Sequence, residues 1–77
     1  MPYMIVIEEG ETSFGSYVPD LLGCVAVGET ESEVKQSIQE AIEFHLEYLQ
    51  DSGAAIPKPL SKSEYVEVLA VQFRSNN

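Results

Sequence analysis

The sequence has few basic residues, a single cysteine and no long apolar run. Four Lys and Arg stand against thirteen Asp and Glu, which gives a formal net charge of −9. Proteins bind nucleic acids largely by neutralising phosphates with Lys and Arg, so direct binding to a nucleic acid is not expected. The acidity either favours a basic protein as partner or keeps a small protein soluble. Composition alone leaves both interpretations open.

The absence of other special segments also limits where the protein works. Cys24 is the one cysteine, so an internal disulfide is excluded. The N-terminus lacks the basic start and apolar run of a signal peptide, and no stretch approaches the roughly 18 apolar residues that span a bilayer. We therefore expect a cytoplasmic protein that does not associate with membranes. With 77 residues and no internal repeat, residues 1–77 are expected to form one domain.

The first half of the chain has the pattern of an antiparallel meander. Residues 3–9 are rich in β-branched side chains, residues 10–13 have turn composition, and residues 14–18 predict a second strand. Pro19 and Asp20 close that strand, Gly23 permits a turn, and residues 24–27 predict a third strand.

A helix is predicted from a cap at Thr30 to about Asp51, before Gly53, because Thr30 and Glu33 have the spacing of a capping box. One side of this helix is apolar and is expected to cover one face of the sheet. Its members are Val34, Ile38, Ala41, Ile42, His45, Leu46 and Leu49, widened by Phe44 and Tyr48. The other side carries Gln36, Glu40, Glu43 and Glu47.

The prolines at 57 and 59 interrupt regular structure, and residues 65–73 then predict a long closing strand. The expected fold is a small α+β domain of order β-β-β-α-β, with an antiparallel sheet and one helix on one face. The first and closing strands are apolar on both alternations, which one helix cannot cover. We therefore expect a dimer or tetramer, with Val66, Val68 and Ala70 at the interface.

Candidate chemistry is sparse, and no catalytic residue, cofactor or metal ligand is predicted. His45 lies in the apolar stripe with no usual metal ligand at neighbouring helical positions, so a hydrogen-bonded core histidine is expected. Cys24 lies in an apolar run without a nearby basic residue, which favours a buried, unreactive thiol over a nucleophile paired with His45. The glycines match no phosphate-binding spacing.

Acidic residues are the remaining candidates. A divalent-metal or acid–base site among them is conceivable, but carboxylates on a solvated helix face lack the burial that raises a pKa. We therefore treat them as weak candidates for contact with a basic partner. The set comprises Glu40, Glu43, Glu47, Glu8 and Asp20.

Three motifs together resemble the HicB-like antitoxin family. They are P-D-L-x-G-C at residues 19–24, G-E-T at 28–30 followed by Glu33, and A-I-x-x-H-L-E at 41–47. The resemblance extends from about residue 3 to Pro59. It implies a partial RNase H-like fold with the element order predicted above.

The resemblance also implies a function in binding. Such proteins typically neutralise a small, basic HicA-type ribonuclease toxin by covering its active site. Many members carry a further C-terminal DNA-binding domain, and we expect this chain to be a single-domain member without one. Two alternatives stay open: a stand-alone oligomeric binding module, and a degenerate metal-dependent nuclease.

Overall fold

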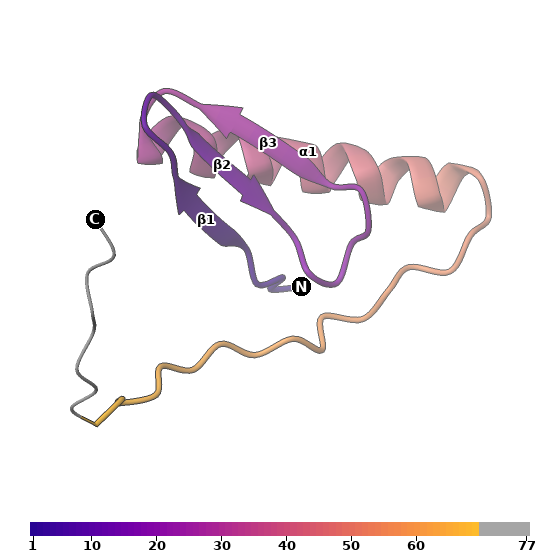
Figure 1. Ribbon diagram of the computed structural model, residues 1–77. Helices are drawn as coiled ribbons and strands as arrows, with labels where there is room; N and C mark the ends of the chain where they lie inside the picture. The colour runs from indigo at the N-terminus through magenta and orange to yellow at the C-terminus, as the bar shows by residue number, and fades with distance from the viewer. Residues whose placement is uncertain (70–77) are drawn as a thin grey trace.

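The computed structural model describes residues 1–69, which form three strands followed by one helix (Figure 1). The strands are β1 (Val6–Glu9), β2 (Phe14–Tyr17) and β3 (Val25–Gly28), and the helix is α1 (Glu31–Asp51). Each strand is shorter than or shifted from its predicted range, but the order, the types and the helix limits agree with the sequence. The small α+β domain is confirmed over this part.

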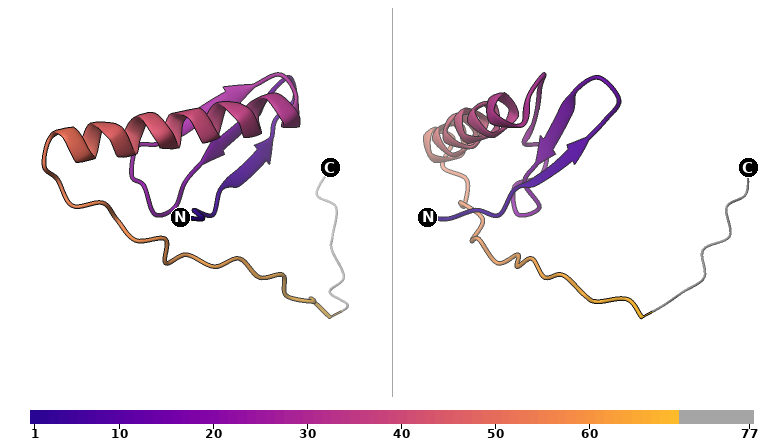
Figure 2. Two further views of the ribbon diagram at one scale, coloured as in Figure 1. Left: turned by 180° about the vertical axis from the view of Figure 1, so that it is seen from behind. Right: turned by 90° about the vertical axis from the view of Figure 1, so that its left-hand side faces the viewer.

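The three strands form one antiparallel sheet in the order β1-β2-β3. Tyr17 of β2 lies opposite Val6 of β1 and Val25 of β3. Directly opposed residues of an antiparallel sheet project to the same side, so these three side chains share one face. Helix α1 lies across the other face, as the two views of Figure 2 show.

The core lies between this helix and the connection from β2 to β3. Val18, Leu21 and Cys24 of the connection pack with Ile38 of α1, and each is at most 4% exposed. The connection is tight, because the Leu21 amide donates to the Val18 carbonyl at 3.0 Å and the Cys24 amide to the Leu21 carbonyl at 3.1 Å. Its turn passes through Gly23 at a φ of 83°, a conformation that glycine adopts without strain.

The helix begins with the predicted cap. The Glu33 amide donates to Thr30 Oγ1 at 3.0 Å, and Glu33 Oε2 accepts from the Glu29 amide at 3.1 Å. The carboxylate thus reaches one residue beyond the Thr30 amide of a standard capping box. Two backbone donors at the helix start are satisfied in this way, and Glu31 and Glu33 also complement the positive end of the helix dipole.

Phe44 and Tyr48 differ from the prediction. The sequence places them at the flank of the apolar stripe, yet they are 75% and 64% exposed. The buried stripe instead contains Val34 and Ile38, with Ala41, Ile42 and Leu46 packed against the core. A sheet of three short strands is too narrow to cover the full apolar arc of a 21-residue helix.

The predicted closing strand is wrong over residues 65–69, which form no strand, and residues 70–73 lie outside the described part. A strand is stable only beside a hydrogen-bonding neighbour, and this segment leaves the domain instead of lying along the sheet (Figure 1). Residues 54–64 form the linker between α1 and this segment. Two contacts hold the linker before it departs: the Tyr3 hydroxyl donates to the Pro57 carbonyl, and Asp20 binds Ser61.

The junction between β3 and α1 generates a testable prediction at Gly28. A Cβ atom at this position would lie 2.7 Å from the Val34 nitrogen and 3.0 Å from its Cα, both of which are backbone atoms. Gly28→Ala must therefore displace the helix start, and we expect a loss of about 1–3 kcal/mol in the free energy of unfolding, measured by urea denaturation. The control is Gly15→Ala, whose Cβ meets nothing within 4 Å. Equal stability of the two variants would contradict the close approach.

Candidate partner-binding surfaces

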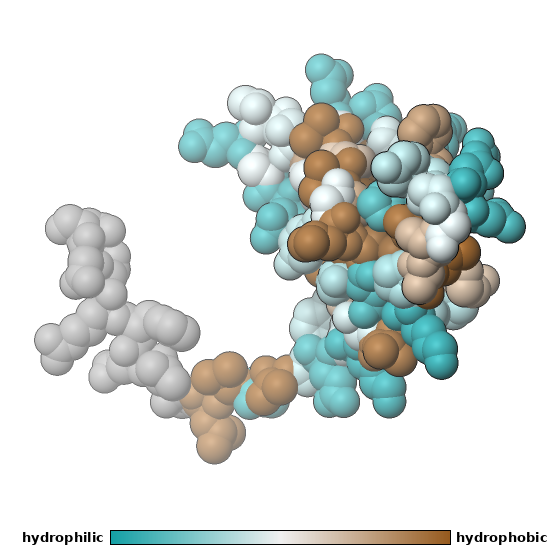
Figure 3. Space-filling view, turned by 90° about the vertical axis from the view of Figure 1, so that its right-hand side faces the viewer, coloured by the Kyte–Doolittle hydropathy of each residue, from teal (hydrophilic) through white to brown (hydrophobic). Residues whose placement is uncertain are grey.

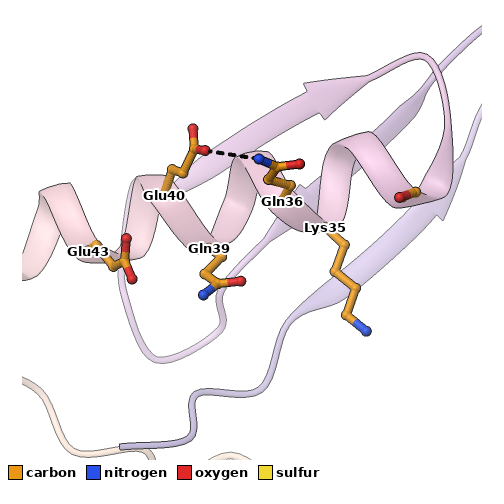
Figure 4. Close-up of a pocket in the computed structure, with 6 residues that line it drawn as sticks. Lys35, Gln36, Gln39, Glu40 and Glu43 are labelled. Atoms are coloured by element: carbon orange, nitrogen blue, oxygen red, sulfur yellow. Dashed lines mark hydrogen bonds between the residues drawn. The ribbon is translucent and has the colours of Figure 1, made fainter.

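The predicted acidic residues of the helix lie together on its solvent side. Glu40, Glu43 and Glu47 are all exposed. Glu40 accepts a hydrogen bond from Gln36 Nε2 at 3.4 Å, and both belong to a shallow hollow that Glu43 also lines (Figure 4). Lys35 lines the same hollow, so the lining carries charges of both signs.

An exposed aromatic pair adjoins these carboxylates. Phe44 follows Glu40 by four residues and precedes Tyr48 by four, so the three occupy neighbouring positions on the helix surface. We call the set Glu40, Glu43, Phe44, Glu47 and Tyr48 the acidic–aromatic face. Sequence reasoning assigned the two aromatics to the core and missed this face. The available signal was the four-residue spacing between Glu40 and Phe44, because residues four apart in a helix lie on the same side and Glu40 is already predicted to face solvent.

Asp20 is engaged within the chain. Its Oδ2 accepts from the Ser61 amide at 3.0 Å and its Oδ1 from the Ser61 hydroxyl at 2.9 Å, in a part-buried position. Both carboxylate oxygens therefore serve to hold the linker against the connection between β2 and β3. A role for Asp20 in partner binding remains only a prediction.

Glu8 lies on the sheet face opposite the helix. Its β1 position is exposed, and it shares a side with Val6, Tyr17, Val25 and Val27, which we call with Glu8 the outer sheet face. Val25 and Val27 are 66% and 76% exposed. The five predicted acidic residues are thus spread over three places: the helix surface, the outer sheet face and the loop after β2.

A groove runs between the N-terminal segment and the helix. Tyr3 and Ile5 line one wall, and Ile42 and Leu46 line the other, with Ile38 between them. The lining also includes Lys35, Gln39 and Glu43. We call it the N-terminal groove. The groove is open on this side because α1 packs most closely on β3 and β2 and touches β1 least.

The oligomer-interface candidates lie at the end of the described chain. Val66 and Val68 are 80% and 66% exposed and make no part of the packed core. Ala70 lies outside the described residues.

Cys24 and His45 are the residues considered as a nucleophile and its base. Cys24 is a free thiol in the core, and its burial raises its pKa, which disfavours the reactive thiolate. His45 is partly buried on α1 beside the packed core. Residues 1–69 contain no group of three or more His, Cys, Asp or Glu placed to hold a metal ion. Within the same range, no helix is long and apolar enough to cross a membrane.

Two known proteins are similar to this chain in sequence over most of its length. An uncharacterized 14.9 kDa protein from the rep-hol intergenic region of Haemophilus phage HP1 (strain HP1c1) is 35% identical over 66 residues, covering 86% of this chain and 50% of that protein. The chain thus spans about half the length of the phage relative. A UPF0150 protein of Helicobacter pylori (strain J99) is 38% identical over 64 residues, covering 82% of this chain and 89% of that protein.

A solved structure and a family model also match this chain. A chain of the solved HicA3 and HicB3 toxin-antitoxin complex matches with a TM-score of 0.64 and 31% identity, covering 77% of this chain and 72% of that one. The model of the HicB_like antitoxin of bacterial toxin-antitoxin systems matches residues 3–72. The resemblance carried by the sequence motifs is therefore confirmed, and the chain belongs to the HicB-like antitoxin family.

Proposed function

We propose that this chain neutralises a small, basic ribonuclease of the HicA type by covering its active site, and that this partner docks on the acidic–aromatic face of α1. The observation that carries the proposal is the match to a chain from a toxin–antitoxin complex at 31% identity, over 77% of this chain. A structural relative at this identity supports a partner of the same kind. The charge and surface chemistry support where it docks.

Long-range electrostatics favour a basic partner. The net charge of −9 gives the whole molecule a negative field, and opposite charges accelerate diffusional encounter. Glu40, Glu43 and Glu47 concentrate part of this charge on one exposed side of the helix, where Lys35 lines the same hollow as Glu40 and Glu43.

Short-range contact then requires desolvation of apolar surface. Interface centres are enriched in aromatic side chains, and acidic residues are more usual at the rim. Phe44 and Tyr48 already stand exposed on a rigid helix, so docking costs little ordering of the backbone. The acidic–aromatic face therefore combines the two chemistries that association with a basic enzyme needs.

The partner itself is the first thing to test. Tagged full-length chain, purified with its native complexes from source cells, is expected to retain a small basic protein that cleaves RNA once it is separated under mild denaturation and refolded. Adding the chain back is expected to stop that cleavage at equimolar amounts. A partner that is neither basic nor a ribonuclease, or recovery of this chain alone, would contradict the proposed function.

Charge reversal tests the steering role of the helix. The triple variant E40K/E43K/E47K is expected to slow association with the recovered partner by about ten-fold at low salt, with a flatter dependence on ionic strength. The measurement is stopped-flow or surface plasmon resonance across a salt series. The control E9K/E11K/E29K makes the same change in net charge at exposed residues away from this face. If both variants slow association equally, the net charge of the whole molecule sets the association rate, and the acidic–aromatic face has no special part in it.

Truncation of the aromatic pair tests the contact itself. Phe44→Ala with Tyr48→Ala is expected to weaken binding by at least about ten-fold, mainly through faster dissociation, because the truncation removes apolar contact area without removing charge. Folding should be unaffected, since both side chains are exposed. The matched control is Val25→Ala with Val27→Ala. A loss of affinity in the control alone would move the docking site to the outer sheet face.

A further inference from the structure

The sheet has an open edge beside an open apolar groove. In the described residues β1 pairs with β2 alone, so its other edge presents unpaired backbone groups. The N-terminal groove lies at this side of the domain, between Tyr3 and Ile5 and the helix residues Ile42 and Leu46. An added strand beside β1 would extend the sheet beneath the part of α1 that the sheet does not reach.

The same chain carries an apolar segment that covers nothing. Tyr65, Val66, Val68 and Leu69 are between 66% and 102% exposed. In Figure 3 the hydrophobic side chains that precede the grey residues stand clear of the domain. The radius of gyration is 16.1 Å, against about 11 Å for a compact chain of this length. An extended apolar segment and an uncovered apolar groove are therefore present in one molecule.

The alternation of the segment fits the groove in one orientation. Successive side chains of a strand project to opposite faces, so Val66 and Val68 share one side and Glu67 lies on the other. A buried, unpaired carboxylate is costly, which directs Glu67 to the outer side and the two valines into the groove. Tyr65 and Leu69 then extend the apolar outer sheet face next to Val6.

The path of the linker favours exchange between molecules. The Tyr3 hydroxyl and the Asp20 carboxylate hold Pro57 and Ser61, and beyond Ser61 the segment departs from the sheet in both views of Figure 2. Pro57 and Pro59 have fixed φ and restrict the residue before each, which keeps the chain extended up to its anchor at Ser61. Exchange of an identical element between two copies is a low-cost route to a dimer, and a segment that departs from its own sheet is available for such an exchange.

We infer that the partner of this segment is a second copy of the chain: residues 65–69 of each molecule add a strand to the free edge of β1 in the other and place Val66 and Val68 in its N-terminal groove. The exchange is reciprocal, so it closes as a two-fold dimer. Of the acidic–aromatic face of α1 only Glu43 borders the groove, and Phe44 and Tyr48 are not among its lining residues. The dimer therefore forms whether or not the proposed toxin exists.

Sedimentation equilibrium of the purified full-length chain at micromolar concentrations tests the dimer. The expected result is twice the 8.5 kDa mass of one chain for the unmodified protein. Val66→Asp with Val68→Asp is expected to sediment as a monomer with an unchanged helical circular dichroism spectrum. The control Val25→Asp with Val27→Asp, which introduces the same charges at comparably exposed valines, is expected to remain a dimer.

Three sedimentation results would overturn the inference. If the unmodified protein is a monomer, a second copy of the chain is not the partner of the segment. A dimer that survives Val66→Asp with Val68→Asp uses another surface. A control that also becomes monomeric places the interface on the outer sheet face.

Hydrogen exchange provides the second readout, because it locates the new strand directly. In the unmodified dimer, the amides of residues 65–69 and those on the free edge of β1 are expected to exchange more slowly than in Val66→Asp with Val68→Asp. A dimer in which residues 65–69 exchange as fast as in that variant contradicts the inference. Slow exchange of these amides in a monomer would show that the strand closes on its own domain, which also contradicts it.

Discussion

The backbone of α1 approaches β3 so closely at Gly28 that no side chain fits between them, and this contact fixes where the helix lies. Because Val34 sits against Gly28, the first turns of α1 are held over β3, and Ile38 reaches the Val18–Cys24 connection. The helix consequently covers the β3 side of the sheet best and the β1 side least. The N-terminal groove, and the exposure of Phe44 and Tyr48, both follow from that placement.

The features that the sequence predicts well are those whose causes lie within a few residues. Thr30 and Glu33 satisfy amides that are next to them in the chain, and Gly23 makes a turn that its own backbone freedom permits. The order of three strands and a helix follows from such local signals. Motif spacing also sufficed to identify the family, because the motifs lie at the strand–turn and strand–helix junctions that define this fold.

The features that the sequence predicts poorly depend on contacts between residues that are distant in the chain, or on contacts with other molecules. Asp20 reads as a surface acid, but its carboxylate is occupied by Ser61, 41 residues later, which only the path of the linker reveals. Phe44 lies at the edge of the apolar stripe, and the width of the sheet decides whether such a position is covered. Residues 65–69 have the composition of a strand but find no neighbour to pair with in their own domain.

The solvent side of α1 and the β1 edge are different regions of this small molecule, and their positions permit two kinds of association at once. Negative charge and two aromatic rings occupy the solvent side of α1, whereas the aliphatic surfaces lie on the outer sheet face and along the β1 edge. Association between copies through the β1 edge would leave Phe44 and Tyr48 accessible, because the helix surface borders the groove there only through Gln39 and Glu43. A dimer would then present that surface twice, so that one dimer could engage two partner molecules.

Residues 54–69, which comprise the linker and the apolar segment, have a consequence for the lifetime of the protein. This stretch lies outside the sheet and the helix. It is exposed along most of its length and has no helix or strand to protect its peptide bonds, which is the kind of segment that proteases cleave first. A cut between Ser61 and Tyr65 would leave the sheet, the helix and both linker anchors intact while releasing the apolar segment. Degradation would therefore begin outside the folded core, at a rate set by how often this segment is uncovered.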